Sequence, residues 1–261
     1  MKSRESDLVR EQVRSRYADI AESNESCCSS DCCTPTSLGD GTFSARLGYS
    51  EDELATVPVG SNMGLGCGNP RVIAALQPGE VVLDLGSGGG FDCFLAARQV
   101  GAEGKVIGVD MTPEMIAKAR ANGRKSDFEN VEFRLGEIEH LPVADSSIDV
   151  IVSNCVINLS PEKDQVFQEA YRVLRPQGRL AVSDVIAIRP LPESVKKDMD
   201  AHCGCVAGAV TVAEIEQMLR RVGFAKISIE VQEGSDQFIR DWFPGTSIEN
   251  HVRAAAITAY K

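Results

Sequence analysis

Short apolar runs alternate with helix-like stretches over most of the chain, and this alternation restricts the possible folds more than any other feature. The expected strands lie at 80–86, 105–110, 131–136, 147–154 and 179–186. The expected helices between them lie at 89–101, 112–125 and 161–174. Strands joined by helices of this length pair in parallel through right-handed crossovers. With a later helix at 212–223 and strands at 225–232 and 254–261, the pattern predicts an α/β fold with a seven-stranded, mostly parallel sheet.

The N-terminal 61 residues have a different character and are expected to form a separate region, 1–61, ahead of the main domain at 62–261. Apolar residues at near-helical spacing predict a first helix over 1–22. The stretch 23–61 is rich in serine, glycine, threonine and cysteine, which is typical of a loop-rich arm. A short helix is expected after Ser50, because a glutamate three residues later forms a capping-box pattern.

The charge and hydropathy of the chain indicate its cellular compartment and which classes of partner it is expected to bind. The net charge is −11, and a negative surface is a poor ligand for a phosphate backbone, so nucleic acid is not an expected partner. The charged N-terminus has no apolar segment typical of a signal peptide, and no apolar stretch is long enough to cross a bilayer. We therefore expect a cytoplasmic protein without membrane contact. In that compartment the nine cysteines are core fillers, ligands or redox thiols rather than a disulfide framework.

A glycine-rich loop, VLDLGSGGGFD (82–92), joins the first expected strand of the sheet to the following helix. Its glycines, Gly86, Gly88 and Gly90, allow close approach of the backbone to a ligand. The spacing differs from G-x-G-x-x-G, because Phe91 stands where the third glycine would be. Asp84 precedes the loop, and Asp110 ends the next strand, where this architecture holds ribose hydroxyls. A dinucleotide dehydrogenase and a simple tight turn are the alternatives.

The acid-x-G-x-G-x-G pattern resembles the S-adenosylmethionine loop of class I methyltransferases, which have a Rossmann-like fold. The resemblance implies that Asp84 serves the amino group or the sulfonium charge, and that Asp110 accepts from the ribose hydroxyls. Met111 would then lie against the adenine, with Ile138 and Glu139 along its edge. Taken alone, Glu139 is equally well interpreted as a solvated loop acid.

Five cysteines lie within the expected methyltransferase domain, and each has an ordinary structural interpretation. Cys93 is on the apolar face of a helix and is expected to be core filler. Cys155 follows the fourth strand, at the edge of the sheet where ligands bind in open α/β folds. Taken alone, it is interpreted equally well as a core filler or as a functional thiol. Cys67 is flanked by glycines, which favours its interpretation as an exposed functional thiol. Cys203 and Cys205 lie in the break at 188–210, which is expected to roof the cofactor pocket near the acceptor.

The arm holds four more cysteines in the sequence CCSSDCC. These are Cys27, Cys28, Cys32 and Cys33. Two vicinal pairs could bind zinc or another thiophilic ion, but no C-x-x-C pairs with matching spacing are present, so a zinc ribbon is weakly indicated. A thiol-rich tail is the alternative. A separate hypothesis for the protein's function is a non-enzymatic zinc or metalloid binder built on CCSSDCC.

Residues 64–210 resemble the arsenite S-adenosylmethionine methyltransferase family in GCGNP, LDLGSG-x-G-x-DC, VDMT, SNCVINL, SDV and C-x-x-GA. The resemblance places Cys67, Cys155 and Cys205 on the family's three arsenic-binding cysteines, and an arm cysteine near a fourth that forms disulfides during the cycle. Soft thiolates select soft ions, and the lone pair of trivalent arsenic can attack the methyl group without a general base. Asn154, also on the cofactor side, and Asn158 would support the pocket.

The family resemblance implies a substrate of arsenite or its thiol conjugates, with S-adenosylhomocysteine as co-product. It also implies a thiol reductant, from a thioredoxin or glutathione system, to restore oxidised cysteines. Larger family members carry an added C-terminal domain, which this chain is expected to lack. The main alternative is a class I methyltransferase for a quinone or another carbon acceptor, in which the cysteines are incidental.

Overall fold

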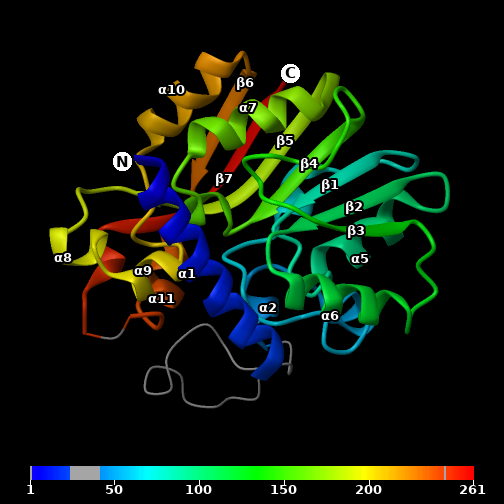
Figure 1. The fold of residues 1–261 in the computed structure, drawn as a ribbon, viewed down its shortest axis with the longest axis horizontal. Helices are drawn as coiled ribbons and strands as arrows, with labels where there is room; N and C mark the ends of the chain where they lie inside the picture. Colours follow the sequence, from blue (N-terminus) through cyan, green and yellow to red (C-terminus); the bar gives the residue numbers. More distant parts are fainter. Residues whose placement is uncertain (1, 24–41, 244) are drawn as a thin grey trace.

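The computed structural model describes residues 2–23, 42–243 and 245–261, and these form a seven-stranded sheet with helices on both faces (Figure 1). The strand order is β3-β2-β1-β4-β5-β7-β6. The strands are β1 (Val81–Leu85), β2 (Lys105–Asp110), β3 (Val131–Leu135), β4 (Ile148–Asn154), β5 (Leu174–Ala187), β6 (Ala225–Val231) and β7 (Val252–Tyr260). The first five pair in parallel, whereas β7 is antiparallel to both β5 and β6, which confirms a mostly parallel sheet.

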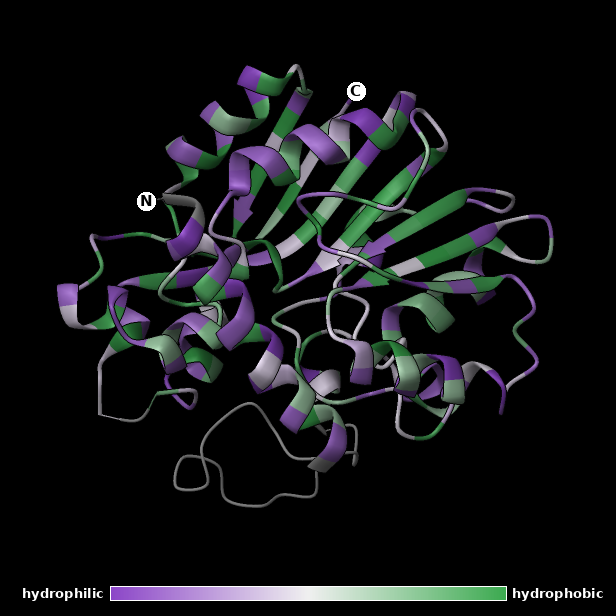
Figure 2. Ribbon diagram, in the orientation of Figure 1, coloured by the Kyte–Doolittle hydropathy of each residue, from purple (hydrophilic) through white to green (hydrophobic). Residues whose placement is uncertain are grey.

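Four helices of the sheet layers follow the predicted alternation. They are α5 (Phe91–Val100), α6 (Pro113–Gly123), α7 (Lys163–Val173) and α10 (Val212–Val222). A fifth, α4 (Pro70–Ala74), precedes β1 and is not predicted from the sequence. Side chains alternate between the two faces of a strand, so Val82 packs with α4, α5 and α6 while Leu83 faces the core beneath α7 and α10. Figure 2 shows the central strands largely hydrophobic, as two covered faces require.

The remaining helices lie at the carboxyl ends of the strands. They are α1 (Lys2–Ser23), α2 (Thr42–Arg46), α3 (Glu51–Ala55), α8 (Glu193–Lys196), α9 (Met199–Cys203) and α11 (Asp236–Ile239). The predicted capping box of α3 is present, with Ser50 and Glu53 each bonded to the other's backbone N–H. In Figure 1, α1 crosses the front of the molecule and packs against α6 and α9. Among the described residues, no helix is long and apolar enough to cross a membrane.

Two local predictions differ from the structure. The fifth strand begins at Leu174 rather than 179, because Leu174 already pairs with Ile148 ahead of an irregularity in the β4–β5 ladder. The stretch 188–210 is not a simple break, since it contains α8 and α9. Short helices with few buried apolar residues give a weak periodic signal, so the sequence does not predict them.

Candidate active site

A cavity opens at the carboxyl ends of β1, β2 and β4, where the strand order of the sheet reverses. Its empty volume, counted out to open solvent, is about 1120 Å³. Of the predicted cofactor residues, the cavity is lined by Asp84, Gly86, Gly88, Asp110, Met111, Ile138, Glu139 and Asn154. Gly90 is absent from this lining. It adopts a left-handed φ of 94° at the start of α5, and an added Cβ there would lie 2.8 Å from both Phe133 and Phe94.

The glycine-rich loop is held in place by the end of the neighbouring strand. Gly86 and Gly88 have φ values of 72° and 49°, which side-chain-bearing residues rarely adopt. The N–H of Gly88 donates to Asp110 Oδ2 at 2.9 Å, and the N–H of Thr112 donates to Oδ1 at 2.9 Å. Each carboxylate oxygen keeps a further lone pair, so Asp110 can still accept from a ribose at the cavity wall.

Asp84 lies beneath the loop and is shielded from water. The Cys93 thiol donates to its Oδ2 at 3.1 Å. Burial, followed by the negative charge of Asp92, raises the pKa of Asp84 from 3.8 to about 8. Cys93 itself is fully buried in the core between α5 and the sheet, so the predicted filler also has a hydrogen-bonding role. A cationic ligand beside Asp84 would favour its charged form.

Glu139 is not a solvated loop acid, because its side chain is only 3% exposed. Its Oε1 accepts from the Ser160 hydroxyl at 2.6 Å and from Arg10 Nε at 3.2 Å. Arg10 comes from α1, and no motif in the sequence points to it. Val13 and Tyr17 of the same helix also line the cavity. None of the residues lining it comes from 188–210, so α1 takes the covering position that the sequence assigns to that stretch.

The structure brings Cys67, Cys155 and Cys205 into one buried cluster beside this cavity, together with Cys203. Cys155 alone among them lines the cavity. Its backbone N–H donates to Ser183 O at 2.8 Å, and the Cys205 thiol donates to its carbonyl oxygen. The neighbouring thiols of Cys205 and Cys67, together with burial, raise the pKa of the Cys155 thiol well above its usual value. Cys67 is fully buried, contrary to the exposed thiol that its flanking glycines suggest.

Two of these cysteines have unusual backbone geometry. The φ values are 59° at Cys155 and 63° at Cys205, in the left-handed region that costs side-chain-bearing residues about 1 kcal/mol. Such conformations cluster at functional sites, where the surrounding structure imposes them. Here the loop after β4 and the turn after α9 both bend sharply, and each presents its thiol to the same cluster.

Cys67 is held against the sheet by Asn154 at the end of β4. The Cys67 N–H donates to Asn154 Oδ1 at 3.0 Å, and Asn154 Nδ2 donates to Gly68 O at 2.8 Å. Tyr49 adds a hydroxyl that donates to Asp92 at 2.7 Å and lies 3.2 Å from Asn154 Nδ2. Asn154 therefore lines the cavity while both ends of its amide hold the Cys67 loop. Asp92 belongs to the LDLGSG-x-G-x-DC motif, but the motif gives it no role, and no motif includes Tyr49.

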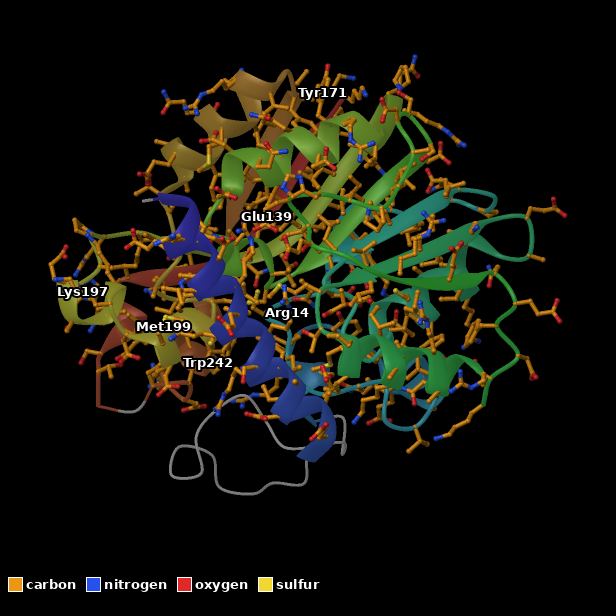
Figure 3. All side chains as sticks on the ribbon, viewed as in Figure 1. Arg14, Glu139, Tyr171, Lys197, Met199 and Trp242 are labelled. Atoms are coloured by element: carbon orange, nitrogen blue, oxygen red, sulfur yellow. The ribbon has the colours of Figure 1, made fainter. Side chains whose placement is uncertain are left out.

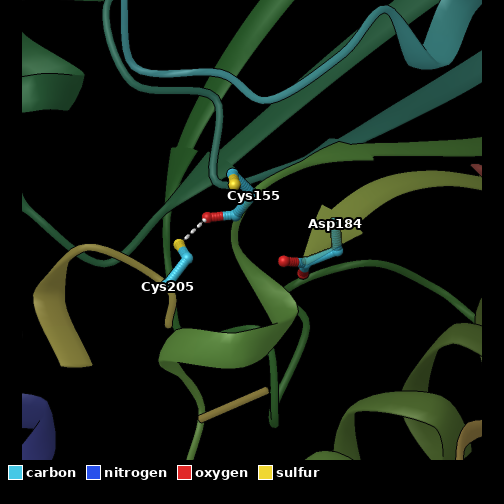
Figure 4. Close-up of side chains that lie close together, drawn as sticks. All are labelled: Cys155, Asp184 and Cys205. Atoms are coloured by element: carbon cyan, nitrogen blue, oxygen red, sulfur yellow. Dashed lines mark hydrogen bonds between the residues drawn. The ribbon is translucent and has the colours of Figure 1, made fainter. Parts of the chain in front are cut away.

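A buried carboxylate, Asp184, accompanies the thiols (Figure 4). One ligand atom from each of Asp184, Cys155 and Cys205 lies within 4.8 Å of the other two. Asn158 Nδ2 donates to Asp184 Oδ1 at 2.9 Å, as does the Val185 N–H at 2.7 Å. Burial raises the pKa of Asp184 to about 6. The signal for Asp184 is the SDV motif at the end of the fifth strand, but the motif by itself gives an acid there no role.

Cys203 ends α9 and is buried, and its carbonyl oxygen accepts from the Tyr17 hydroxyl at 3.1 Å. Cys27, Cys28, Cys32 and Cys33 lie outside the described residues, so their predicted roles are not addressed by the structure.

Several known proteins are similar to this chain. Residues 76–223 match the family described as a methyltransferase domain. An arsenite methyltransferase from Halobacterium salinarum is 53% identical over 99% of this chain and 68% of its own length. One from Aquipseudomonas alcaligenes is 42% identical over 83% of this chain. This chain spans 62% of that second relative.

A solved structure is also similar. The crystal structure of an arsenic(III) S-adenosylmethionine methyltransferase from Chlamydomonas reinhardtii aligns with a TM-score of 0.61 and 34% identity. The alignment covers 87% of this chain and 74% of that one.

Proposed function

The chain belongs to the arsenite methyltransferase family, and we propose that it methylates trivalent arsenic held by Cys67, Cys155 and Cys205. The methyl donor of this family is S-adenosylmethionine. One observation supports the proposal: three buried thiols from three separate loops share one cluster beside the cavity, with Cys155 on the cavity wall and interacting with both Cys205 and Cys67. Soft thiolates prefer a soft acceptor, and three of them complete the coordination of trivalent arsenic.

Arsenic would enter by exchange with external thiols. Each exchange transfers one cysteine sulfur to arsenic and returns one proton to the departing thiol, so three exchanges leave a trithiolate. Cys155 and Cys205 have strained backbones, which would fix the directions of two of the three sulfur–arsenic bonds. The arsenic lone pair would then face the cavity, because Cys155 lies on its wall.

Methyl transfer would be an in-line displacement. The arsenic lone pair forms the As–C bond while the C–S bond breaks, and its electron pair stays on sulfur in S-adenosylhomocysteine. The nucleophile carries no proton, so no general base is required. Arsenic is formally oxidised by two electrons, and returning it to the trivalent state oxidises two thiols to a disulfide. A thioredoxin or glutathione system would reduce that disulfide.

The proposal assigns the cofactor side of the site to residues that line the same cavity. Asp110 would accept from the ribose hydroxyls, Met111 and Ile138 would flank the adenine, and Glu139 would accept from its amino group. Asp84, beneath the loop, would face the cationic end of the methionine moiety.

Product analysis is the direct test of the acceptor. After incubation with arsenite, a thiol and S-adenosylmethionine, we expect methylated arsenic in amounts matched by S-adenosylhomocysteine. A parallel reaction with a quinol addresses the carbon-acceptor alternative. Methylated quinol without methylated arsenic would overturn the proposal.

Binding of S-adenosylmethionine should release a proton at pH 7. Asp84 has a pKa of about 8 in the free protein, so most molecules carry the proton at that pH. The ligand's positive charges stabilise the carboxylate and lower its pKa, which expels up to about one proton per ligand bound. Calorimetry in phosphate and in Tris measures this proton, because the two buffers differ in ionisation enthalpy. Asp84→Asn should abolish the release, and proton uptake by the unmodified protein would contradict the assignment.

A further inference from the structure

Arg10 is buried although it lies on the outermost helix of the molecule. Its residue exposure is 8%, and arginine is rarely that buried unless it is paired. α1 is held at two further points, by the Tyr17 hydroxyl on Cys203 O at 3.1 Å and by Lys118 Nζ on Ala21 O at 3.0 Å. Because α1 is held at these points, Arg10 has a fixed position on the cavity wall.

The partners of Arg10 are carboxylates, and one of them belongs to the cofactor site. Arg10 Nε donates to Glu139 Oε1, and Nη2 donates to Glu162. Two more acids lie nearby: Glu137 Oε2 is 3.8 Å from Arg10 Nε, and Asp7 Oδ1 is 3.3 Å from Arg10 Nη1. Glu139 is the most enclosed of these acids, and Figure 3 shows it beside α1.

The contacts on Glu139 leave its two oxygens unequal. Arg10 and Ser160 both donate to Oε1. Among the residues that the structure describes, none donates a hydrogen bond to Oε2. A carboxylate with one oxygen fixed by two donors cannot rotate freely, so the direction of the second oxygen is fixed as well.

We propose that Arg10 is a positioning residue for S-adenosylmethionine, and that it holds Glu139 so that Oε2 accepts from the adenine amino group. The inference rests on the cofactor part of the proposed function and not on the acceptor. It makes the N-terminal helix a functional part of the cofactor site, 129 residues away from Glu139 in sequence. It also predicts selectivity for adenine, because an acceptor oxygen favours an amino group and repels a carbonyl group at the same ring position.

The test compares three ligands by calorimetry on the full chain: S-adenosylmethionine, S-adenosylhomocysteine and S-inosylhomocysteine, which has a carbonyl in place of the amino group. For Arg10→Gln we expect both adenosyl ligands to bind about tenfold more weakly. The preference for S-adenosylhomocysteine over its inosyl analogue should shrink by a similar factor. A simple charge effect would instead change the ratio between the sulfonium and its uncharged product. Arg10→Lys, which retains one donor, should recover part of the preference.

Arg14→Gln is the matched control. Arg14 lies one turn along α1 and pairs with Glu137 at 3.0 Å, but its side chain is 41% exposed and does not line the cavity. This variant should leave all three affinities unchanged. If Arg10→Gln does not fold, Ser160→Ala removes the other donor to Oε1 and should reduce the same preference. An unchanged preference in a folded Arg10→Gln protein, or in Ser160→Ala in its place, would overturn the proposal. Because no arsenic is present, the result is independent of the acceptor.

Discussion

Replacing Cys155 with serine should reduce arsenite methylation by about a hundredfold or more, with S-adenosylmethionine affinity changed less than about twofold. Serine is nearly isosteric with cysteine, so the change leaves the shape of the side chain at this left-handed position almost unaltered. Its oxygen is a hard donor and a poor ligand for trivalent arsenic. The change therefore removes one of the three proposed arsenic ligands, the one on the cavity wall, and leaves the proposed cofactor residues in place. Rates of methylarsenic formation and calorimetric titration measure the two effects separately.

Cys93→Ser is the control for this variant. Cys93 is equally buried, and a serine hydroxyl can still donate to Asp84, so methylation should persist. Cys205→Ser should resemble Cys155→Ser, because the two thiols lie in the same cluster. Full activity in Cys155→Ser would exclude the three-sulfur acceptor site.

The sheet can be predicted from sequence because its signals are local. Each buried strand is a short apolar run, and most are separated from the next by a helix with its own periodicity. Gly86 and Asp110 can be found for the same reason, since a glycine-rich turn and an acid at a strand end keep a fixed spacing. The short helices α8 and α9 have no such run, and sequence patterns do not reveal them.

The thiol cluster depends on contacts that local patterns do not encode. Cys155 and Cys205 are 50 residues apart and meet only because the loop after β4 faces the turn after α9. Each cysteine is ambiguous by itself, and the family resemblance rather than spacing joins them. Arg10 has no signal at all, since its charge is one of several on a highly charged helix. Asp184 is visible within SDV, but its burial beside two thiols depends on the register of β5 against β4.

Gly86→Ala should weaken S-adenosylmethionine binding by about a hundredfold and reduce methylation at least as much. The new Cβ would lie 2.4 Å from Val156 Cγ2, and a φ of 72° adds strain of about 1 kcal/mol. Either the glycine-rich loop moves away from the ligand, or the Val156 side chain is displaced. Calorimetry with S-adenosylmethionine and the methylation rate are the measurements.

The steric cause is tested by relieving the contact with Val156, because Gly88 cannot serve as a control: it also lines the cofactor cavity. In a Gly86→Ala protein, a second change, Val156→Ala, should restore much of the binding by removing the obstructing methyl groups. An unchanged loss after that relief would rule out the steric explanation. Val156 directly follows Cys155, so displacement of Val156 should also move the Cys155 thiol, which lines the same cavity. Steric contact at Gly86 therefore links the position of the cofactor loop to the position of the proposed arsenic-binding thiol, and that link predicts a larger loss in methylation than in binding.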